Sequence, residues 1–151
     1  MSCEDVFLKK LRDQGFRMTM QREVVLSVLH KLPRASSAEE IFSRVQQVSS
    51  AVDISTVYRT LELLQEFNMV ISSDVGAGHR IYKLVSVEEP HIHLVCRGCG
   101  KVFGVEPDPA DELAAYLAEH YQFQMDLENF HIDGLCKDCG DRAEGRAETA
   151  I

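Results

Sequence analysis

The sequence predicts an α+β chain built from two modules. Three observations support this prediction: the order of its periodic segments, the uneven distribution of its charge, and two cysteine pairs in its second half. Its 151 residues are enough for one ordinary domain or for two small ones. The composition, 45% hydrophobic and 26% charged, is that of a globular protein.

The charge of the chain differs between its halves. Residues 1–83 contain 11 Lys+Arg and 10 Asp+Glu, a net charge of +1, whereas residues 84–151 contain 5 and 14, a net charge of −9. Only the first half could approach phosphates without strong repulsion. Because its positive charge is weak, any DNA affinity must also depend on geometry and dimerisation.

The first half has the element order of a winged helix-turn-helix. Apolar residues recur at helical spacing in four segments. Thr19, the S-x-x-E box that begins at Ser37, and either Asp53 or Ser55 are suitable helix caps. The expected elements are helices at residues 3–14, 20–32, 38–48 and 54–67 and hairpin strands at residues 69–72 and 80–84.

The second half predicts a small α/β module. The expected elements are strands at residues 92–96, 102–105 and 126–133 and a helix at residues 109–121. Asp108 is the expected cap of this helix, because Pro109 suits a first helical position. The predicted domains are a winged-helix domain at residues 1–85, a hinge at 86–90, a zinc-binding domain at 91–140 and, for lack of an apolar face, a disordered tail at 141–151.

The two cysteine pairs give the strongest chemical signal. Cys96 and Cys99, and then Cys136 and Cys139, each form a CxxCG knuckle, with 36 residues between the pairs. Four thiolates in this arrangement can hold one tetrahedral ion, as structural zinc sites do. The alternatives are disulfides or redox CxxC motifs, but a redox motif is expected at a strand-to-helix junction, which this pattern lacks. Cys3 is left over as a free thiol.

The outer face of the helix expected at residues 54–67 is a candidate for reading DNA. An arginine can bind guanine through two hydrogen bonds, and a tyrosine can contact a thymine methyl group. An ordinary solvated face is the alternative, and the helix-turn-helix context favours DNA. The candidate contacts are Ser55, Thr56, Tyr58 and Arg59 on this helix, Arg17 for the minor groove or a phosphate, and Gln21 and Arg22 for phosphates.

His91 and His93 are candidate metal ligands. They alternate along a short extended segment, so their rings are expected on the same face. Paired imidazoles can begin a transition-metal site, although a surface histidine pair without function is the ordinary alternative. Their position between the predicted hinge and the first cysteine pair strengthens the case for metal binding, and both alternatives stay open.

No membrane span or secretion signal is expected. No apolar stretch reaches the roughly 18 residues that a span requires, and the chain is charged from its first few residues. The predicted location is the cytoplasm, where CxxC pairs more often bind metal or do redox chemistry than form disulfides.

Several stretches of the sequence resemble the ferric uptake regulator family of dimeric, metal-responsive transcription repressors. The most specific are ISTVYRTL at residues 54–61 and HIHLVCRGCGKV at residues 91–102. The resemblance implies a homodimer that binds a double-stranded DNA operator, with an N-terminal winged helix-turn-helix domain followed by a small α/β dimerisation domain with a four-cysteine zinc site. It also implies base-reading roles for Tyr58 and Arg59, a minor-groove role for Arg17, and a second divalent transition metal (Fe2+, Mn2+, Zn2+ or Ni2+) between the domains.

The regulatory metal site departs from the family pattern. The positions without the usual ligand are Ala35, Lys83 and Gly104 in this site and Pro90, Ile92 and Glu128 in a second family site, where only Asp111 is kept. The regulatory candidates are therefore His91 and His93, joined by His79, Glu106 or His131.

Three explanations fit this altered site: other residues complete it, the protein senses another signal, or it binds DNA in one fixed conformation. The leading prediction is a metal-responsive repressor, and the alternative is a constitutive or differently triggered DNA-binding protein with structural zinc only. A zinc enzyme built on His91 and His93 is disfavoured, because the sequence has no HExxH motif and no assigned third ligand with a general base.

Overall fold

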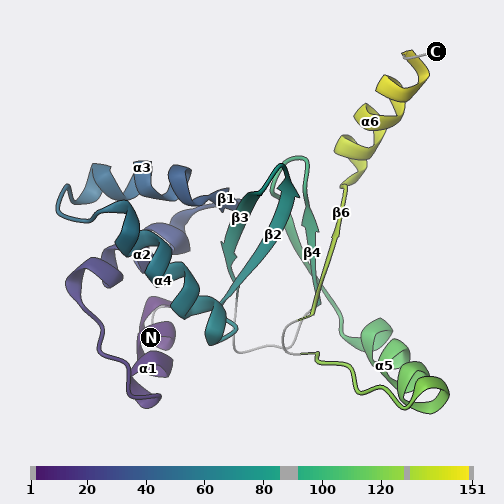
Figure 1. Ribbon diagram of the computed structural model, residues 1–151, viewed down its shortest axis with the longest axis horizontal. Helices are drawn as coiled ribbons and strands as arrows, with labels where there is room; N and C mark the ends of the chain where they lie inside the picture. The colour runs from purple at the N-terminus through teal and green to yellow at the C-terminus, as the bar shows by residue number, and fades with distance from the viewer. Residues whose placement is uncertain (1–2, 86–91, 128–129, 150–151) are drawn as a thin grey trace. The chain divides into compact units, whose positions relative to one another are not determined.

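The computed structural model describes residues 3–85, 92–127 and 130–149. Its chain divides into two compact units, unit 1 (Met1–Val87) and unit 2 (Glu88–Ile151). Unit 1 contains four helices and a small sheet, and unit 2 contains a second sheet and two further helices (Figure 1). The predicted hinge at residues 86–90 lies outside the described residues.

Unit 1 begins with four helices at the places that the apolar periodicity predicts. They are α1 (Cys3–Asp13), α2 (Met20–Lys31), α3 (Ala38–Val48) and α4 (Ile54–Glu66). The side chains of Thr19 and Asp53 accept hydrogen bonds from backbone N–H groups in the first turns of α2 and α4. Ser37 forms the predicted capping box with Glu40 at the start of α3. These caps confirm three expected helix starts, and Asp53, of the two candidates, is the cap of α4.

The wing of unit 1 is a three-stranded antiparallel sheet. Its strands are β1 (Ser36–Ser37), β2 (Val70–Gly76) and β3 (His79–Leu84), in the order β1-β3-β2. The hairpin of β2 and β3 is confirmed, and a register shift between Asp74 and Gly76 lies next to its turn. The short strand β1, which the sequence did not predict, ties the residues before α3 to the outer side of the hairpin.

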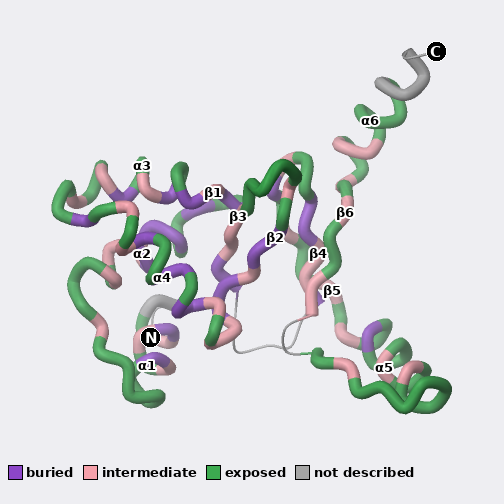
Figure 2. The backbone as a smooth tube through the Cα atoms, viewed as in Figure 1, coloured by how far each residue is buried: buried purple, intermediate pink, exposed green. Residues whose placement is uncertain are grey.

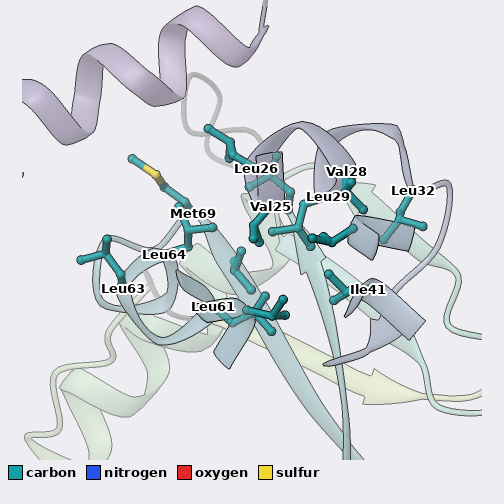
Figure 3. Close-up of a cluster of buried hydrophobic side chains, with 14 of the residues drawn as sticks. Val25, Leu26, Val28, Leu29, Leu32, Ile41, Leu61, Leu63, Leu64 and Met69 are labelled. Carbon is teal, nitrogen blue, oxygen red and sulfur yellow. The ribbon is translucent and has the colours of Figure 1, made fainter. Parts of the chain in front are cut away.

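One apolar core holds the helices of unit 1 to its wing. Side chains from all four helices meet those of Met69, Val70 and Leu84 in this core. Figure 3 shows part of the cluster; the residues labelled there are Val25, Leu26, Val28, Leu29, Leu32, Ile41, Leu61, Leu63, Leu64 and Met69. Because Val57, Leu61 and Leu64 of α4 all point into this core, the opposite face of α4 is turned outward.

Unit 2 contains a mixed three-stranded sheet and two helices. Its elements are β4 (Ile92–Cys96), β5 (Val102–Val105), α5 (Asp108–Tyr121), β6 (His131–Gly134) and α6 (Lys137–Thr149). The strand order is β5-β4-β6, with β4 antiparallel to β5 and parallel to β6. The segment from α5 to β6 therefore acts as a crossover that returns the chain to the edge of β4.

Three details of unit 2 differ from the sequence predictions. Pro107, not Asp108, is the N-cap of α5, and it makes no side-chain cap hydrogen bond, so Asp108 is a helical residue whose charge suits the first turn. The last strand is shorter than the 126–133 predicted. The tail predicted to be disordered at 141–151 is helical through Thr149, because alanine, glutamate and arginine favour a helix even without an apolar face.

Unit 2 buries little apolar surface of its own. Its described buried hydrophobic side chains are Ile92, Val95, Cys96 and Ala110. Figure 2 shows α5 and the segment after it mostly exposed. The large apolar side chains exposed in this unit are Phe103, Leu113, Tyr116, Tyr121, Phe123, Leu127, Ile132 and Leu135. In the described parts of the chain, no helix is both long and apolar enough to cross a membrane.

Candidate metal and nucleic-acid sites

Four cysteines from two distant parts of unit 2 converge on one point. Cys96 ends β4, Cys99 lies in the turn after it, Cys136 follows β6, and Cys139 lies in the first turn of α6. Their sulfur atoms all lie within 4.8 Å of one another. Because β4 and β6 are paired, the sheet itself brings the two knuckles together.

The backbone around each knuckle is arranged for this convergence. The N–H groups of Gly100 and Gly140 donate to the carbonyls of Cys96 and Cys136 at 2.9 and 2.8 Å, closing the two turns. Gly100 has a φ of 74°, which a side chain would disfavour. At Gly98, an added Cβ would lie 2.8 Å from the Cys139 sulfur, so the close approach of the second knuckle requires glycine there.

The local environment shifts the pKa values of Cys96 and Cys139 in opposite directions. Burial raises the pKa of the Cys96 thiol, but hydrogen bonds from backbone N–H groups, that of Cys136 first, lower it to about 6. Hydrogen bonding to the Cys136 and Cys96 sulfurs raises the pKa of Cys139 to about 12. The cluster therefore favours a thiolate at Cys96 and resists a full set of thiolates unless a cation compensates their charge.

This donor set fits a structural zinc ion. Four sulfur ligands form the closed tetrahedral set that structural zinc prefers, with no position left for a reacting water. The Cys99 and Cys136 sulfurs are 3.8 Å apart, far beyond the roughly 2.05 Å of a disulfide bond. Cys136 and Cys139 do lie at a strand-to-helix junction, contrary to the sequence expectation, because α6 was not predicted. The convergence of all four sulfurs nevertheless favours metal over a redox pair.

The outward face of α4 presents the predicted DNA-reading residues unequally. Ser55, Tyr58 and Arg59 are exposed. The Thr56 hydroxyl donates to the cap carboxylate of Asp53 at 2.7 Å, so it is committed to the start of the helix. Ser55, Tyr58 and Arg59 are therefore the side chains best placed to meet a ligand.

Tyr58 is held by a residue of the neighbouring helix. Its hydroxyl donates to Oε1 of Glu39 at 2.9 Å, and this hydrogen bond is the first cause of a raised pKa of Tyr58. The pKa of Glu39 is lowered, first by a backbone hydrogen bond and then by the one from Tyr58. This hydrogen bond orients the tyrosine ring. The sequence does not predict it, because Glu39 lies on a different helix, α3, 19 residues earlier in the chain.

The start of α2 supplies the other predicted contacts. Arg17 is exposed, and its carbonyl accepts a hydrogen bond from the Arg22 guanidinium at 3.0 Å. The Gln21 side chain donates to the carbonyl of Ala51 at 3.4 Å, in the turn that precedes α4. The structure therefore brings the N-terminus of α2 and the start of α4 together on one side of unit 1.

The candidate regulatory residues are distributed over both units. His79 begins β3 in unit 1, whereas His93 lies in β4 and Glu106 follows β5 in unit 2. His91 lies outside the described residues. Where the chain is described, the four cysteines are the one group of three or more potential ligands whose donor atoms lie within 4.8 Å of one another.

Lys83 and Gly104 have clear structural settings. The Lys83 ammonium donates to the carbonyl of Leu32, at the C-terminal end of α2, at 2.7 Å. Burial lowers the pKa of Lys83. This lysine ties the wing to α2. Gly104 lies directly opposite His93 in the β4–β5 pair, so this register partner of His93 contributes no side chain.

His131 and Asp133 lie on the other side of His93. His131 is the partner of His93 in the parallel pairing of β4 and β6. Its Nε2 is 3.6 Å from Oδ1 of Asp133, two residues further along β6. The sequence offered His131 as one of several candidates, and only the strand register singles it out.

A winged helix joined to a four-cysteine module defines a class of metal-binding DNA regulators. The chain belongs to the ferric uptake regulator family, whose model matches residues 13–132. A ferric uptake regulation protein of Campylobacter jejuni is 33% identical over 138 residues, covering 90% of this chain and 87% of its own length. A zinc uptake regulation protein of Mycobacterium tuberculosis is 31% identical over 125 residues, covering 83% and 95%.

The similarity extends to solved structures. The ferric uptake regulator Fur of Helicobacter pylori, described as having three functional metal-binding sites, matches with a TM-score of 0.66 and 25% identity, covering 93% of this chain and 95% of its own. Family membership confirms the predicted combination of winged helix-turn-helix, α/β module and four-cysteine site. The chain thus belongs to a family of metal-responsive transcription regulators.

Proposed function

We propose that this chain is a homodimeric transcriptional repressor that binds a double-stranded DNA operator in the cytoplasm and has no enzymatic activity. The observation that carries the proposal is the outward face of α4, where Ser55, Tyr58 and Arg59 are exposed on a helix whose opposite face is locked into the core. A second helix of a helix-turn-helix presented in this way can lie in the major groove.

In this proposal, the residues of unit 1 have separate roles on DNA. Arg59 and Tyr58 read bases, since one can form two hydrogen bonds with guanine and the other offers an aromatic edge to thymine. Ser55 lies at the helix start, where a short polar side chain suits a phosphate, and Thr56 supports this contact by holding the helix start through Asp53. Arg17, Gln21 and Arg22 contact the backbone or minor groove beside this helix. The net charge of +1 in residues 1–83 makes paired binding by a dimer important for affinity.

In unit 2, Cys96, Cys99, Cys136 and Cys139 hold one structural zinc. The exposed apolar side chains of this unit support its role in dimerisation, since a monomer would leave them in water. The zinc fixes β4, β6 and α6 together, and the second chain covers the apolar surface. No reaction step involves this ion.

A second divalent transition metal regulates DNA binding in this proposal. Its candidate ligands are His91 and His93, with His79 or Glu106 completing the set. The ion acts by stabilising the DNA-competent arrangement of the two units. It must bind that arrangement more tightly than the others, and a tenfold gain in operator affinity requires about 1.4 kcal/mol of such preference.

One observation favours a second candidate, a DNA-binding protein with structural zinc only. Lys83 stands where a family carboxylate ligand is usual, and its ammonium is engaged with the carbonyl of Leu32. The positive charge of Lys83 would repel a metal cation bound near it. This candidate differs from the first in requiring no metal response.

A binding experiment separates the two candidates. A duplex selected from a random pool with the full-length protein serves as the operator. The wild-type chain, freed of all metal beyond one zinc per chain, is tested by fluorescence anisotropy with no addition and with Zn2+, Mn2+, Ni2+ or, without oxygen, Fe2+. His93→Ala tests the candidate ligand, and His120→Ala, an exposed histidine on α5, is the matched control.

The metal-responsive proposal predicts that at least one ion increases operator affinity tenfold or more. His93→Ala should lose this increase, and His120→Ala should keep it. Equal affinity for DNA with and without every added ion would overturn the metal response and support the second candidate. Failure to select any duplex would overturn DNA binding itself.

A further inference from the structure

Two neighbouring rows of residues across the unit 2 sheet differ in chemistry. One row across its three strands contains Phe103, Leu94 and Ile132, which the register places side by side on one face. The neighbouring row contains Gly104, His93 and His131, and it belongs to the other face. Side chains of adjacent residues in a strand point to opposite faces, so the polar row stands apart from the apolar one.

The polar row places two imidazoles on neighbouring strands. His93 and His131 are direct partners in a parallel pairing, where strands lie about 4.8 Å apart. Both side chains are half-buried, so they are held by the sheet yet remain accessible. Two rings that rise from one face at this spacing can both reach one ion about 2.0–2.1 Å from each ligating nitrogen.

The surroundings of this pair suit a cation. Asp133 lies two residues after His131 on β6, hence on the same face, with its Oδ1 3.6 Å from the His131 Nε2. A carboxylate that faces one ring nitrogen can orient the imidazole, which is the usual partner arrangement of a metal-bound histidine. On β5, the register partner of His93 is Gly104, which adds no side chain to this row.

We propose that His93 and His131 together bind one divalent transition-metal ion on this face of the unit 2 sheet, with Asp133 positioning the His131 ring. Because Nε2 faces Asp133, His131 binds the metal through Nδ1. Imidazole donors favour Zn2+, Ni2+, Cu2+ or Fe2+ over Mg2+ or Ca2+. This inference rests on the proposed function, for which it identifies a metal site built within one unit and completed by a strand partner of His93.

Metal titration of the full-length protein tests the site. The protein is prepared with one zinc per chain by a chelator too weak to remove the cysteine-bound ion, and Co2+ is then titrated against a chromophoric competitor. The variants are His93→Ala, His131→Ala, Asp133→Asn and the control His120→Ala. Zinc content and sedimentation of each variant report whether the cysteine site and the dimer are intact.

Wild type and His120→Ala should bind a second ion equally. His93→Ala and His131→Ala should weaken its binding at least tenfold, and Asp133→Asn by about tenfold, as loss of an orienting partner does. In wild type with 15N-labelled histidine, Co2+ should broaden or shift the ring signals of His131 and leave those of His120 unchanged.

Two outcomes would overturn the inference and are distinguishable. If His93→Ala loses the second ion while His131→Ala retains it with wild-type affinity, the metal response stands and the site lies elsewhere. If wild type binds no ion beyond its zinc, both this site and the proposed metal response fail. Should His131→Ala lose its zinc through misfolding, the wild-type ring signals decide: an unchanged His131 at saturating Co2+ overturns the inference.

Discussion

The two units of the chain bury very different amounts of apolar surface. Every member of the main core cluster lies in unit 1, from Phe7 on α1 to Leu84 on β3. Among the described residues of unit 2, only Ile92, Val95, Cys96 and Ala110 are buried hydrophobics. Unit 1 is therefore stabilised by its own core, whereas unit 2 requires other sources of stability.

This difference matches the different tasks of the two units. A DNA-reading helix must be held rigidly, and the core of unit 1 does this by fixing the inner face of α4. A module that responds to metal should depend on ligands and partners for its stability, because only then can they change its state. Unit 2 has the cysteine cluster and a large exposed apolar surface for this purpose.

The largest effect is expected from breaking the cysteine cluster. Structural zinc contributes an apparent binding free energy of about 10–16 kcal/mol in zinc-finger peptides, comparable to the whole stability of a typical domain. Cys136→Ser should therefore lose zinc and dimerisation, as measured by metal analysis and sedimentation. Cys3→Ser, which changes the one cysteine outside the cluster, is the control and should retain both. A zinc-loaded, dimeric Cys136→Ser protein would contradict the assignment.

A core substitution in unit 1 should have the next largest effect. Leu61 on α4 is 1% exposed, and Leu61→Ala should reduce the free energy of unfolding of unit 1 by about 2–5 kcal/mol through loss of burial and the cavity left behind. Thermal or urea unfolding measures this change, while the zinc content should stay at one per chain. Leu113→Ala, on a side chain 43% exposed in unit 2, is the matched control and should leave the unfolding of unit 1 unchanged.

Weakening the apolar row of unit 2 should have a smaller effect that is specific to the dimer. Phe103 and Ile132 are 36% and 46% exposed. If the partner chain covers them, Phe103→Ser with Ile132→Ser should raise the dimer dissociation constant tenfold or more, as measured by sedimentation equilibrium. Val48→Ser, which changes an exposed apolar residue of unit 1, should have no such effect. An unchanged dimer would place the interface elsewhere in unit 2.

The smallest predicted effect concerns a helix start in unit 1. Ser37→Ala removes the hydroxyl that accepts the Glu40 N–H in the capping box of α3. The expected loss is about 1 kcal/mol in the free energy of unfolding of unit 1. Chemical denaturation detects a change of this size, and Ser37→Asp, which restores a side-chain acceptor, should recover most of it. A loss as large as that of Leu61→Ala would indicate a role for Ser37 beyond capping.

The same contrast explains what the sequence could predict. The helices of unit 1 were predicted because periodicity and caps such as Ser37 and Asp53 are local signals that agree with the core. Strand β1 was missed because two residues carry no periodicity and their pairing with β3 is a tertiary contact. Helix α6 was missed because its sequence has helix propensity without an apolar face.

The candidate sites were likewise predictable only where the signal is local in the sequence. The cysteine cluster follows from spacing alone, since two CxxCG knuckles are a specific pattern. The contacts of Lys83 with Leu32, of Tyr58 with Glu39 and of His93 with His131 depend on strand register and helix packing, which spacing does not encode. The members of these pairs lie far apart in the chain and meet only in the folded protein, so the sequence alone does not predict them.

The most direct test of this contrast is to compare amide NMR spectra of the full-length protein before and after zinc removal. A strong chelator under reducing conditions is added to the 15N-labelled chain, and amide signals from both units are followed. Signals from unit 1 residues such as Leu61 should keep their folded positions, while those of β4 and β6 should collapse toward unfolded positions. Retention of folded β4 and β6 signals without zinc, or loss of the unit 1 signals together with them, would contradict the account.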